Sequence, residues 1–407
     1  MDKPIYLDNN ATTPIAPQVA STMRPYLEHL YFNPSSMYDA AAQVARAMSE
    51  ARNHVRELIG GVPANEITFT SCATESNNAA IFGAVRALPK KRHIVTTAVE
   101  HPAVIEPCRD LARRGWSVDF LPVDRQGRLD SAEFVRALRT DTLLVTVMHG
   151  NNETGVIFPI EELARITKET NPEILFHTDA TQTVGKIPVD LSEELQNVDM
   201  LTFSAHKLHG PKGIGALFAR RGTPLRPLLL GGHQERGRRG GTENVAGIVG
   251  MGEACRLAGE NLGASERVRA QRDRLQAELE ERIPWLEVNG AEAERLPNAL
   301  SVACHCIEGE SILAQLDAEG VHASSGSACT SGSLEPSHVL KAMGLPFTAL
   351  HGSVRFSLSR YTTEAEIERV IEIFPPIVEA LRRISPYWDT EKASPRADVL
   401  HGQSCLP

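Results

Sequence analysis

The sequence predicts an α/β protein with a large, mostly parallel, seven-stranded sheet, followed by a smaller α+β unit. Three observations lead to this fold class. The first two-thirds of the chain alternate short β-branched runs with helical patterns, which is typical of a parallel sheet covered by helices on both faces. A long charged helical pattern then changes the composition. The length of 407 residues exceeds that of one typical domain and favours two or three.

The predicted strands of the large sheet are short runs rich in β-branched and aromatic residues. They are residues 66–70, 93–97, 117–121, 143–148, 174–178, 200–203 and 214–218. Helical patterns lie between several of these strands. One of them, residues 40–59, ends at Gly60 and Gly61, which suit the C-terminal cap of a helix.

The pattern from about Cys255 to Arg282 predicts one long amphipathic helix, rich in Glu, Arg, Leu and Ala. We place the domain boundary at this change, with a large domain at 15–257 and a small domain at 258–387. The small domain is predicted to contain strands at 299–307 and 354–358 and helices at 310–319 and 364–383. We expect residues 1–14 to pack on the small domain, and residues 388–407 to form a loosely held polar tail.

Composition narrows the function classes. The net charge of −9 and the pI of 5.9 argue against nucleic-acid binding, since no basic excess would attract phosphates. The basic run at 235–239 is interpreted as a solvated loop when taken alone. Neither a signal peptide nor a membrane-spanning apolar run is visible. Seven irregularly spaced cysteines fit reduced thiols, so we expect a cytoplasmic protein. From the charge and the lack of a membrane-spanning run, we expect that it binds neither nucleic acid nor membrane.

Lys207 is a candidate for covalent catalysis. It ends the segment Ser204-Ala205-His206-Lys207, directly after a predicted strand and before a Gly-rich turn. Schiff-base chemistry requires a lysine in such a crowded, partly desolvated place. The alternative is a solvated surface lysine, which is the commoner case for an isolated lysine.

Asp179 makes that chemistry more plausible. It ends the predicted strand 174–178, where open α/β sheets place their ligands. A carboxylate there can pair with a protonated pyridine nitrogen, and Gln182 can hydrogen-bond a hydroxyl of the same ring. The alternative is that Asp179 caps the following helix.

Other loops that follow predicted strands supply further polar residues. Residues 70–76, which include Ala73 and Thr74, would offer free N–H groups to an anion, although ordinary helix capping explains them as well. His101 could stack on a ring and exchange protons near neutral pH, although a lone histidine is more often structural. Asn152 follows a further strand. Together these loops predict one shared pocket.

Cys329 is the most informative cysteine. It lies in a Ser/Gly-rich loop, residues 324–337, which has almost no core-forming side chains. Most free cysteines are buried and inert, whereas a thiol on a mobile loop could react at one site and discharge at another. Cys304 and Cys306 could suggest a metal clip, but their strand-like alternation favours core packing. Cys72 is interpreted as a small packing residue.

Arg355 alternates with apolar neighbours on a predicted strand. Its guanidinium could bind a substrate α-carboxylate through two parallel hydrogen bonds. The alternative is a surface ion pair, which the local sequence leaves open.

Four segments carry a family resemblance: residues 177–182, 205–213, 239–244 and 324–337. On these motifs the chain resembles the cysteine desulfurases related to class V aminotransferases, particularly the nitrogen-fixation NifS type. The match runs from about Tyr6 to Trp388. It implies the aspartate-aminotransferase fold (fold type I of the pyridoxal-phosphate enzymes), a homodimer with sites at the subunit interface, and pyridoxal 5'-phosphate as cofactor.

The resemblance also implies a role for each motif residue. Lys207 would hold the cofactor as a Schiff base, with Asp179 and Gln182 on its ring and His101 stacked against it. The cofactor phosphate would be held by Ala73, Thr74, Ser204 and His206, with Thr242 reaching the phosphate of the other subunit. Asn152 and Arg355 would position the carboxylate of L-cysteine. Cys329 would take the substrate sulfur as a persulfide.

The predicted function is therefore conversion of L-cysteine to L-alanine, with sulfur passed to a U-type iron–sulfur scaffold, for nitrogenase in this subtype. No resident metal is expected, although Cys329 could transiently ligate an iron–sulfur cluster shared with the scaffold. Two alternatives stay open. One is another pyridoxal-phosphate enzyme, such as a selenocysteine lyase or an aminotransferase, and the other is a non-catalytic sulfur carrier.

Overall fold

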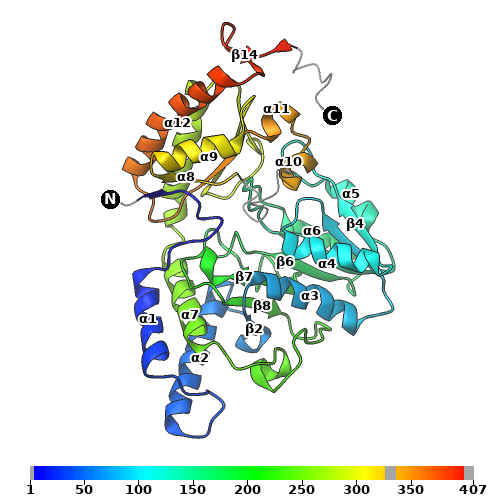
Figure 1. Cartoon of the computed structure of the whole chain (residues 1–407). Helices are drawn as coiled ribbons and strands as arrows, with labels where there is room; N and C mark the ends of the chain where they lie inside the picture. Colours follow the sequence, from blue (N-terminus) through cyan, green and yellow to red (C-terminus); the bar gives the residue numbers. More distant parts are fainter. Residues whose placement is uncertain (1–3, 326–335, 398–407) are drawn as a thin grey trace.

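The computed structural model describes residues 4–325 and 336–397. A seven-stranded sheet forms the lower body in Figure 1, and a smaller sheet with its helices lies above it. The strand order of the large sheet is β2-β8-β7-β6-β5-β3-β4. Its strands are β2 (Ile67–Thr70), β3 (His93–Thr97), β4 (Ser117–Leu121), β5 (Thr142–Thr146), β6 (Leu175–Asp179), β7 (Met200–Ser204) and β8 (Gly215–Ala219).

All seven predicted strands are present, each within two residues of its expected bounds. The strands β4, β3, β5, β6 and β7 run parallel to one another, while β8 is antiparallel to both of its neighbours, β2 and β7. Since β2 therefore runs in the same direction as β7, the carboxyl ends of six strands lie at one edge. The prediction of a mostly parallel sheet is confirmed.

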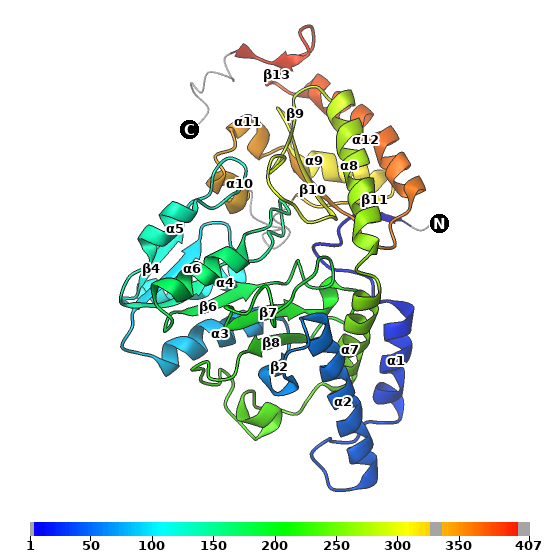
Figure 2. The same ribbon diagram turned by 180° about the vertical axis from the view of Figure 1, so that it is seen from behind.

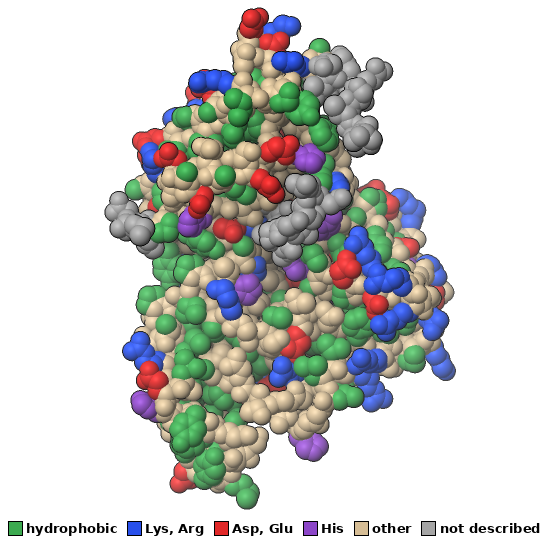
Figure 3. All heavy atoms as spheres, viewed as in Figure 1, with side chains coloured by type: hydrophobic (Ala, Val, Ile, Leu, Met, Phe, Trp, Pro, Cys, Tyr) green, Lys and Arg blue, Asp and Glu red, His purple; other side chains and the backbone are tan. Residues whose placement is uncertain are grey.

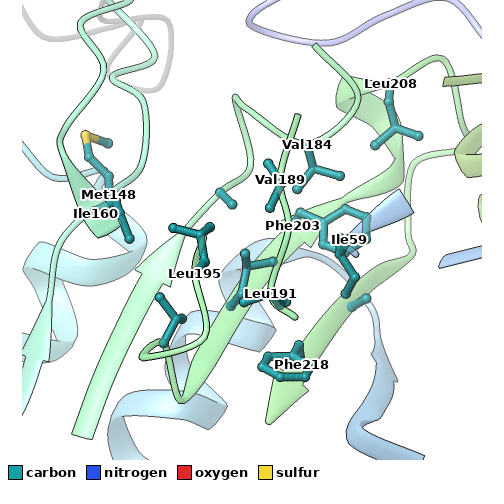
Figure 4. Packing of buried hydrophobic residues seen from close by; sticks show 14 of the residues in the cluster. Ile59, Met148, Ile160, Val184, Val189, Leu191, Leu195, Phe203, Leu208 and Phe218 are labelled. Atoms are coloured by element: carbon teal, nitrogen blue, oxygen red, sulfur yellow. The ribbon is translucent and has the colours of Figure 1, made fainter. Parts of the chain in front are cut away.

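Both faces of the large sheet are buried, as their alternating side chains show. On one face Leu175, Met200 and Leu217 pack under α3 (Ala73–Ala87) and α4 (Pro102–Arg113). On the other face Phe176 and Phe203 belong to the largest core, part of which Figure 4 shows. The helices that contribute to this core are α1 (Pro17–Glu28), α2 (Asp39–Leu58), α5 (Ser131–Ala137), α6 (Ile160–Thr170) and α7 (Val245–Glu260), together with the short helices α10 (His338–Ala342) and α11 (Phe347–Leu350).

The smaller sheet has the antiparallel order β12-β10-β9 and its own core. Its strands are β9 (Leu286–Val288), β10 (Ala299–Cys304) and β12 (Ser353–Ser357). The helices packed on it are α8 (Ala264–Arg282), α9 (Gly309–Ala318) and α12 (Glu364–Ile384). The N-terminal strand β1 (Ile5–Tyr6) pairs in parallel with β11 (Val321–His322), so the chain begins beside this smaller sheet (Figure 2).

The single long helix predicted from Cys255 to Arg282 is wrong, because the chain forms two helices there. Helix α7 ends at Glu260, where the N–H of Asn261 bonds back to Ala258 and Gly259, and α8 begins at Ala264. Ala258 packs in the core of the large sheet, whereas Val268 packs in the core of the smaller one. The break is therefore where the chain passes between the two cores.

The C-terminal region also differs from the expectation of a loosely held tail. Trp388 is buried, and the guanidinium of Arg382 lies 4.1 Å from the centre of its ring. Short strands β13 (Trp388–Asp389) and β14 (Ser394–Pro395) pair as a hairpin. Residues 388–397 are thus anchored by an aromatic side chain. Within the described residues, no helix has the length and apolar character needed to cross a bilayer.

Candidate active site

The polar residues predicted to share a pocket do lie together, at the carboxyl edge of the large sheet. Parallel strands bring the loops that follow them to one edge, although those loops are far apart in the sequence. A cavity of about 690 Å³ opens there. Nine of the predicted site residues line it: Ala73, Thr74, His101, Asn152, Asp179, Gln182, His206, Lys207 and Arg355.

Lys207 ends a short 3-10 turn, η2 (Ala205–Lys207), directly after β7. Its Nζ donates to the backbone oxygens of Asn10 at 2.5 Å and Ala11 at 2.7 Å. Both acceptors belong to the N-terminal segment, which crosses the cavity and is fastened to the η2 turn by the hydrogen bond from Thr13 N to His206 O. The lysine is thus held in the cavity, not on the outer surface.

Asp179 is the last residue of β6, and only 5% of its surface is exposed. Its Oδ2 accepts a hydrogen bond from Asn77 Nδ2 at 2.7 Å, and its Oδ1 accepts one from Thr181 N at 2.9 Å. Asn77 in turn accepts a hydrogen bond from Thr202. The hydrogen bond from Thr181 N corresponds to the alternative role predicted for Asp179, which was to cap the segment that follows its strand. Asp179 therefore caps the turn and also lines the cavity.

The start of α3 is open toward the cavity. Its N-cap is Cys72, which makes no side-chain capping bond, so hydroxyl capping does not account for this segment. Cys72, Ala73 and Thr74 all line the cavity. Gly215 permits this placement, because a Cβ there would lie 2.7 Å from the Cys72 carbonyl carbon. The uncapped helix start offers N–H groups and the positive end of its dipole to an anion.

His101 is the N-cap of α4, and its Nδ1 accepts a hydrogen bond from Ala103 N at 3.1 Å. Burial lowers the pKa of His101, and the positive charge of Lys207 lowers it further, while Asp179 acts in the opposite direction. The ring is therefore neutral at pH 7. Because Nδ1 is the acceptor, Nε2 carries the hydrogen in this neutral form.

His206 is also neutral at pH 7. Burial lowers its pKa to about 4, and the charges of Lys207, Lys212 and Lys186 add to that effect. Its Nδ1 lies 3.1 Å from the hydroxyl oxygen of Thr12. His206 thus borders the cavity as a hydrogen-bonding group without a charge of its own.

Arg355 is on β12 of the smaller sheet, and only 2% of its surface is exposed. Its Nη2 donates to Asp8 Oδ1 at 2.7 Å, and its Nη1 donates to Asn152 O at 2.8 Å. The buried Nε has no hydrogen-bond partner. The alternative prediction of a surface ion pair is confirmed for the ion pair, which Arg355 forms with Asp8, but it is wrong for the surface location. The guanidinium is buried at the wall of the cavity.

Among the described residues, two of the predicted ones do not line the cavity. Ser204 is buried, with its Oγ 3.3 Å from Ile214 O, and Thr242 lies exposed in the loop before α7. Cys329 lies outside the described residues, as does most of the loop 324–337. The chain on either side of it is placed at the cavity, because Ser324 pairs through backbone hydrogen bonds with Arg355, and Pro336 and Ser337 are lining residues.

Cys304 and Cys306 behave as packing residues, whereas the packing role predicted for Cys72 is wrong, because Cys72 is only partly buried and lines the cavity at the start of α3. Cys304 is fully buried in the small core, and burial raises the pKa of its thiol to about 12. Cys306 is buried beside it. Among the residues that the structure describes, no three His, Cys, Asp or Glu side chains are grouped to hold a metal ion.

Comparisons with known proteins match this arrangement. The family described as Aminotransferase class-V matches residues 5–370. Cysteine desulfurase 2 of Trichormus variabilis is 54% identical over 98% of both chains, and the cysteine desulfurase NifS of Azotobacter vinelandii is 51% identical over 94% of this chain and 95% of its own. The chain belongs to the cysteine desulfurase family of class V aminotransferases.

Solved structures of this family share the fold. A NifS-like protein, 38% identical, superposes with a TM-score of 0.87 over 93% of this chain and all of its own. The cysteine desulfurase of Thermococcus onnurineus, 27% identical, gives a TM-score of 0.83 over 93% of this chain and 95% of its own. The fold is thus type I of the pyridoxal-phosphate enzymes, as expected from the resemblance.

Families of this class depend on pyridoxal phosphate, and the cavity fits that cofactor in three respects. The uncapped start of α3 suits a phosphate, and a buried carboxylate, Asp179, suits a protonated ring nitrogen. Lys207 reaches the same cavity with its amine. The volume also lies within the usual range for small-molecule sites, about 300–1,000 Å³.

Several site residues were missed by sequence reasoning. Asn10 and Ala11 hold Lys207 through backbone oxygens, which leave no signal in side-chain chemistry. Asn77 holds Asp179 from a position 102 residues away in the chain. Lys186 lies on the same turn as Gln182, so the spacing of Asp179, Gln182 and Lys186 after one strand was the available signal.

Proposed function

We propose that this chain is a pyridoxal-phosphate-dependent cysteine desulfurase that converts L-cysteine to L-alanine and takes the sulfur onto Cys329. One observation carries the proposal. The chain enters and leaves the Cys329 segment at the wall of the cavity that holds Lys207 and Asp179. Cys329 is four positions beyond Ser325 in the sequence, a span of about 14 Å at most. The thiol therefore belongs to a segment that can reach the cavity.

The cofactor would be held by Lys207 through a Schiff base, by Asp179 at the ring nitrogen, by Gln182 at the ring hydroxyl and by His101 on the ring face. Its phosphate would be held by Ala73 and Thr74 at the start of α3 and by Ser204 and His206 at the end of β7 and in the η2 turn. When bound, pyridoxal phosphate supplies an electron sink for the carbon framework of the amino acid.

The residues of the chain supply the remaining chemistry. Arg355 and Asn152 anchor the carboxylate of the substrate. Lys207 Nζ removes the proton from the substrate Cα and returns this proton elsewhere on the carbon framework. His101 Nε2 exchanges a proton with the substrate thiol. Cys329 Sγ then attacks the substrate sulfur: the carbon–sulfur bond breaks, a sulfur–sulfur bond forms, and Cβ gains a proton to give alanine. Cysteine and a thiol thus become alanine and a persulfide, without an external oxidant.

We further propose a homodimer, in which Thr242 reaches the phosphate site of the partner subunit. An exposed apolar patch supports this: Tyr31, Met37 and Tyr38, on the loop between α1 and α2, and Leu230 are exposed large hydrophobic side chains. Figure 3 shows apolar side chains gathered at the lower left of the molecule, where the loop between α1 and α2 lies in Figure 1. An exposed apolar surface of this kind marks an interaction site in soluble proteins.

The acceptor of the sulfur is proposed to be a U-type iron–sulfur scaffold, with nitrogenase as the destination. The name of the Azotobacter vinelandii relative, NifS, supports this assignment. Cys329 would pass its outer sulfur to a thiol of the scaffold by thiol–disulfide-type exchange.

The test combines colour with product analysis. The purified protein should bind pyridoxal phosphate, lose its visible absorption band on borohydride reduction, and form alanine and sulfide from L-cysteine. Lys207→Ala should retain the fold, shown by circular dichroism, and lose the reducible band and the alanine. A protein that binds no pyridoxal phosphate, or a Lys207→Ala variant that still forms alanine at the wild-type rate, would refute the proposal.

A further inference from the structure

A second lysine, Lys186, lies beside Lys207 and has no part in the chemistry above. It follows β6 on the turn that carries Asp179 and Gln182. Its Nζ donates to Gln182 Oε1 at 2.8 Å and to Asn10 Oδ1 at 2.9 Å. Both acceptors are neutral amide oxygens. Lys91, Lys168 and Lys392, by contrast, each have a carboxylate partner.

The contacts of Gln182 fix the direction of its amide. An ammonium group can only donate hydrogen bonds, so the Gln182 atom that faces Lys186 must be the carbonyl oxygen. The second polar atom of the Gln182 amide lies 3.0 Å from the backbone oxygen of Asn10. A carbonyl oxygen can only accept a hydrogen bond, so this amide atom must be the nitrogen of the NH₂ group. One hydrogen of that group is used by Asn10. The second is available to a ligand in the cavity that Gln182 lines.

Lys186 is also an electrostatic neighbour of Lys207. The two lysines line a small second cavity of about 50 Å³ behind the main one. Burial lowers the pKa of Lys186 well below its usual value, and the charges of Lys207 and Arg355 lower it further. Asp179 and Arg355 line the main cavity with Lys207, and Arg360 lines the second cavity with both lysines. The histidines near these lysines are His101, His206 and His209, whose pKa values are lowered, above all by burial.

We propose that Lys186 is a positioning residue of the cofactor site. It holds the Gln182 amide with the NH₂ group as donor to the ring hydroxyl, and the charge on either amine, Lys186 or Lys207, opposes protonation of the other. Through the first effect, the Gln182 NH₂ group donates a hydrogen bond to the ring hydroxyl oxygen, which becomes negatively charged when it loses its proton. The second favours the neutral form of Lys207, which is the form that reacts with an aldehyde. The inference rests on the proposed function and names a residue through which that site works.

A double-mutant cycle tests the first effect, with the dissociation constant of pyridoxal phosphate as its readout. Lys186→Met should raise that constant about tenfold in the wild-type background, because the Gln182 amide loses one of the two contacts that orient it. In a Gln182→Ala background the same change should raise it less than about twofold. Equal factors in both backgrounds would overturn this effect.

The second effect is measured on the protein without cofactor. Lys207 is labelled with an amine-acylating reagent at a series of pH values, and the modified peptide is quantified by mass spectrometry. Lys186→Met should move the midpoint of labelling upward by about one pH unit, whereas Lys212→Met, at an exposed lysine five residues beyond Lys207, should leave it in place. An unchanged midpoint in Lys186→Met would overturn the second effect.

Lys186→Gln separates the two effects and guards against a folding defect in Lys186→Met. Its amide can still donate to Gln182 Oε1 but carries no charge, so cofactor affinity should recover while the labelling midpoint stays raised. Failure of the proposed function would look different. A wild-type protein that binds no pyridoxal phosphate would refute the proposed function, while labelling of the cofactor-free protein would still decide the charge effect.

Discussion

Arg355 and Asp8 join the two ends of the chain across the candidate site: Arg355 Nη2, on β12, lies 2.7 Å from Asp8 Oδ1, in the N-terminal segment. The same guanidinium donates through Nη1 to Asn152 O, in the loop after β5. One side chain thus ties together the small sheet, the large sheet and the chain start. The proposed substrate anchor is therefore preorganised before any ligand binds.

The role of Arg355 in anchoring the substrate can be tested by truncation. Arg355→Ala should raise the KM for L-cysteine at least about tenfold, because a charge-assisted hydrogen bond to a carboxylate is lost. The absorption spectrum of the bound cofactor should stay the same, since Arg355 is not expected to touch the ring. Steady-state kinetics and a spectrum of each variant are sufficient. An unchanged KM would assign Arg355 a purely structural role.

Asp179 should matter more for turnover than for substrate binding. Asp179→Asn keeps the shape but removes the negative charge, so the ring nitrogen loses its ionic partner and kcat should fall roughly a hundredfold. Asn77→Ala removes one hydrogen bond to the Asp179 carboxylate and should give a smaller loss in the same direction. Rapid kinetics of alanine formation measure both effects. A larger loss in Asn77→Ala than in Asp179→Asn would contradict this order.

Glu100 gives a pH prediction with a defined sign. Burial raises the pKa of this carboxyl from 4.5 to about 8. Between these values the folded protein holds a proton that the unfolded chain releases, so stability falls as pH rises through this window. Relative to wild type, Glu100→Gln should therefore be more stable at pH 8.5 than at pH 5, by roughly 4 kcal/mol.

Urea unfolding of the cofactor-free protein at the two pH values measures this difference. The Gln side chain keeps the oxygen that accepts from Thr97 Oγ1 and Met148 N, so those two contacts stay in place. Any pH-independent cost of the new amide cancels in the comparison. The same difference between variant and wild type at both pH values would show that Glu100 is ionised in the folded protein.

The dimer prediction rests on the exposed loop between α1 and α2. There Tyr38 lies edge-on to Phe32 at 5.9 Å between ring centres, and Met37 next to it is fully exposed. Tyr38→Glu should weaken dimerisation and, with it, the affinity for pyridoxal phosphate, because Thr242 of the partner would be lost. Sedimentation velocity at several concentrations reports the first effect and a cofactor titration the second. Unchanged sedimentation of the variant would exclude this loop from the interface.

Much of the fold followed from local sequence patterns. The strands of the large sheet are short and rich in apolar residues, and all except the edge strand β4 are buried throughout, so they give a strong local signal even though their pairing partners are distant. The break at 261–263 was missed because residues on both sides favour helix, and only the change from one core to the other separates them. The anchoring of the chain after Trp388 depends on its contact with Arg382, which is not a local signal.

The site was predictable where chemistry lies at strand ends. Asp179, His101 and Lys207 each follow a strand, and parallel topology brings them together. The residues that hold these side chains in place were not predictable in this way. Asn10 reaches Lys207 across 197 residues, and it acts through a backbone oxygen that any residue type could provide. Lys186 was passed over because a lysine in a turn is normally solvated.

The transfer of sulfur to Cys329 is the central claim, and mass spectrometry tests it most directly. The wild-type protein, loaded with pyridoxal phosphate, is exposed to L-cysteine, alkylated and digested, and the peptide that contains Cys329 is analysed. We predict one added sulfur atom on Cys329, lost on reduction, and neither the added sulfur nor alanine formation in Cys329→Ser. Alanine formed at the wild-type rate by Cys329→Ser, or a wild-type Cys329 that never gains sulfur during turnover, would contradict the account.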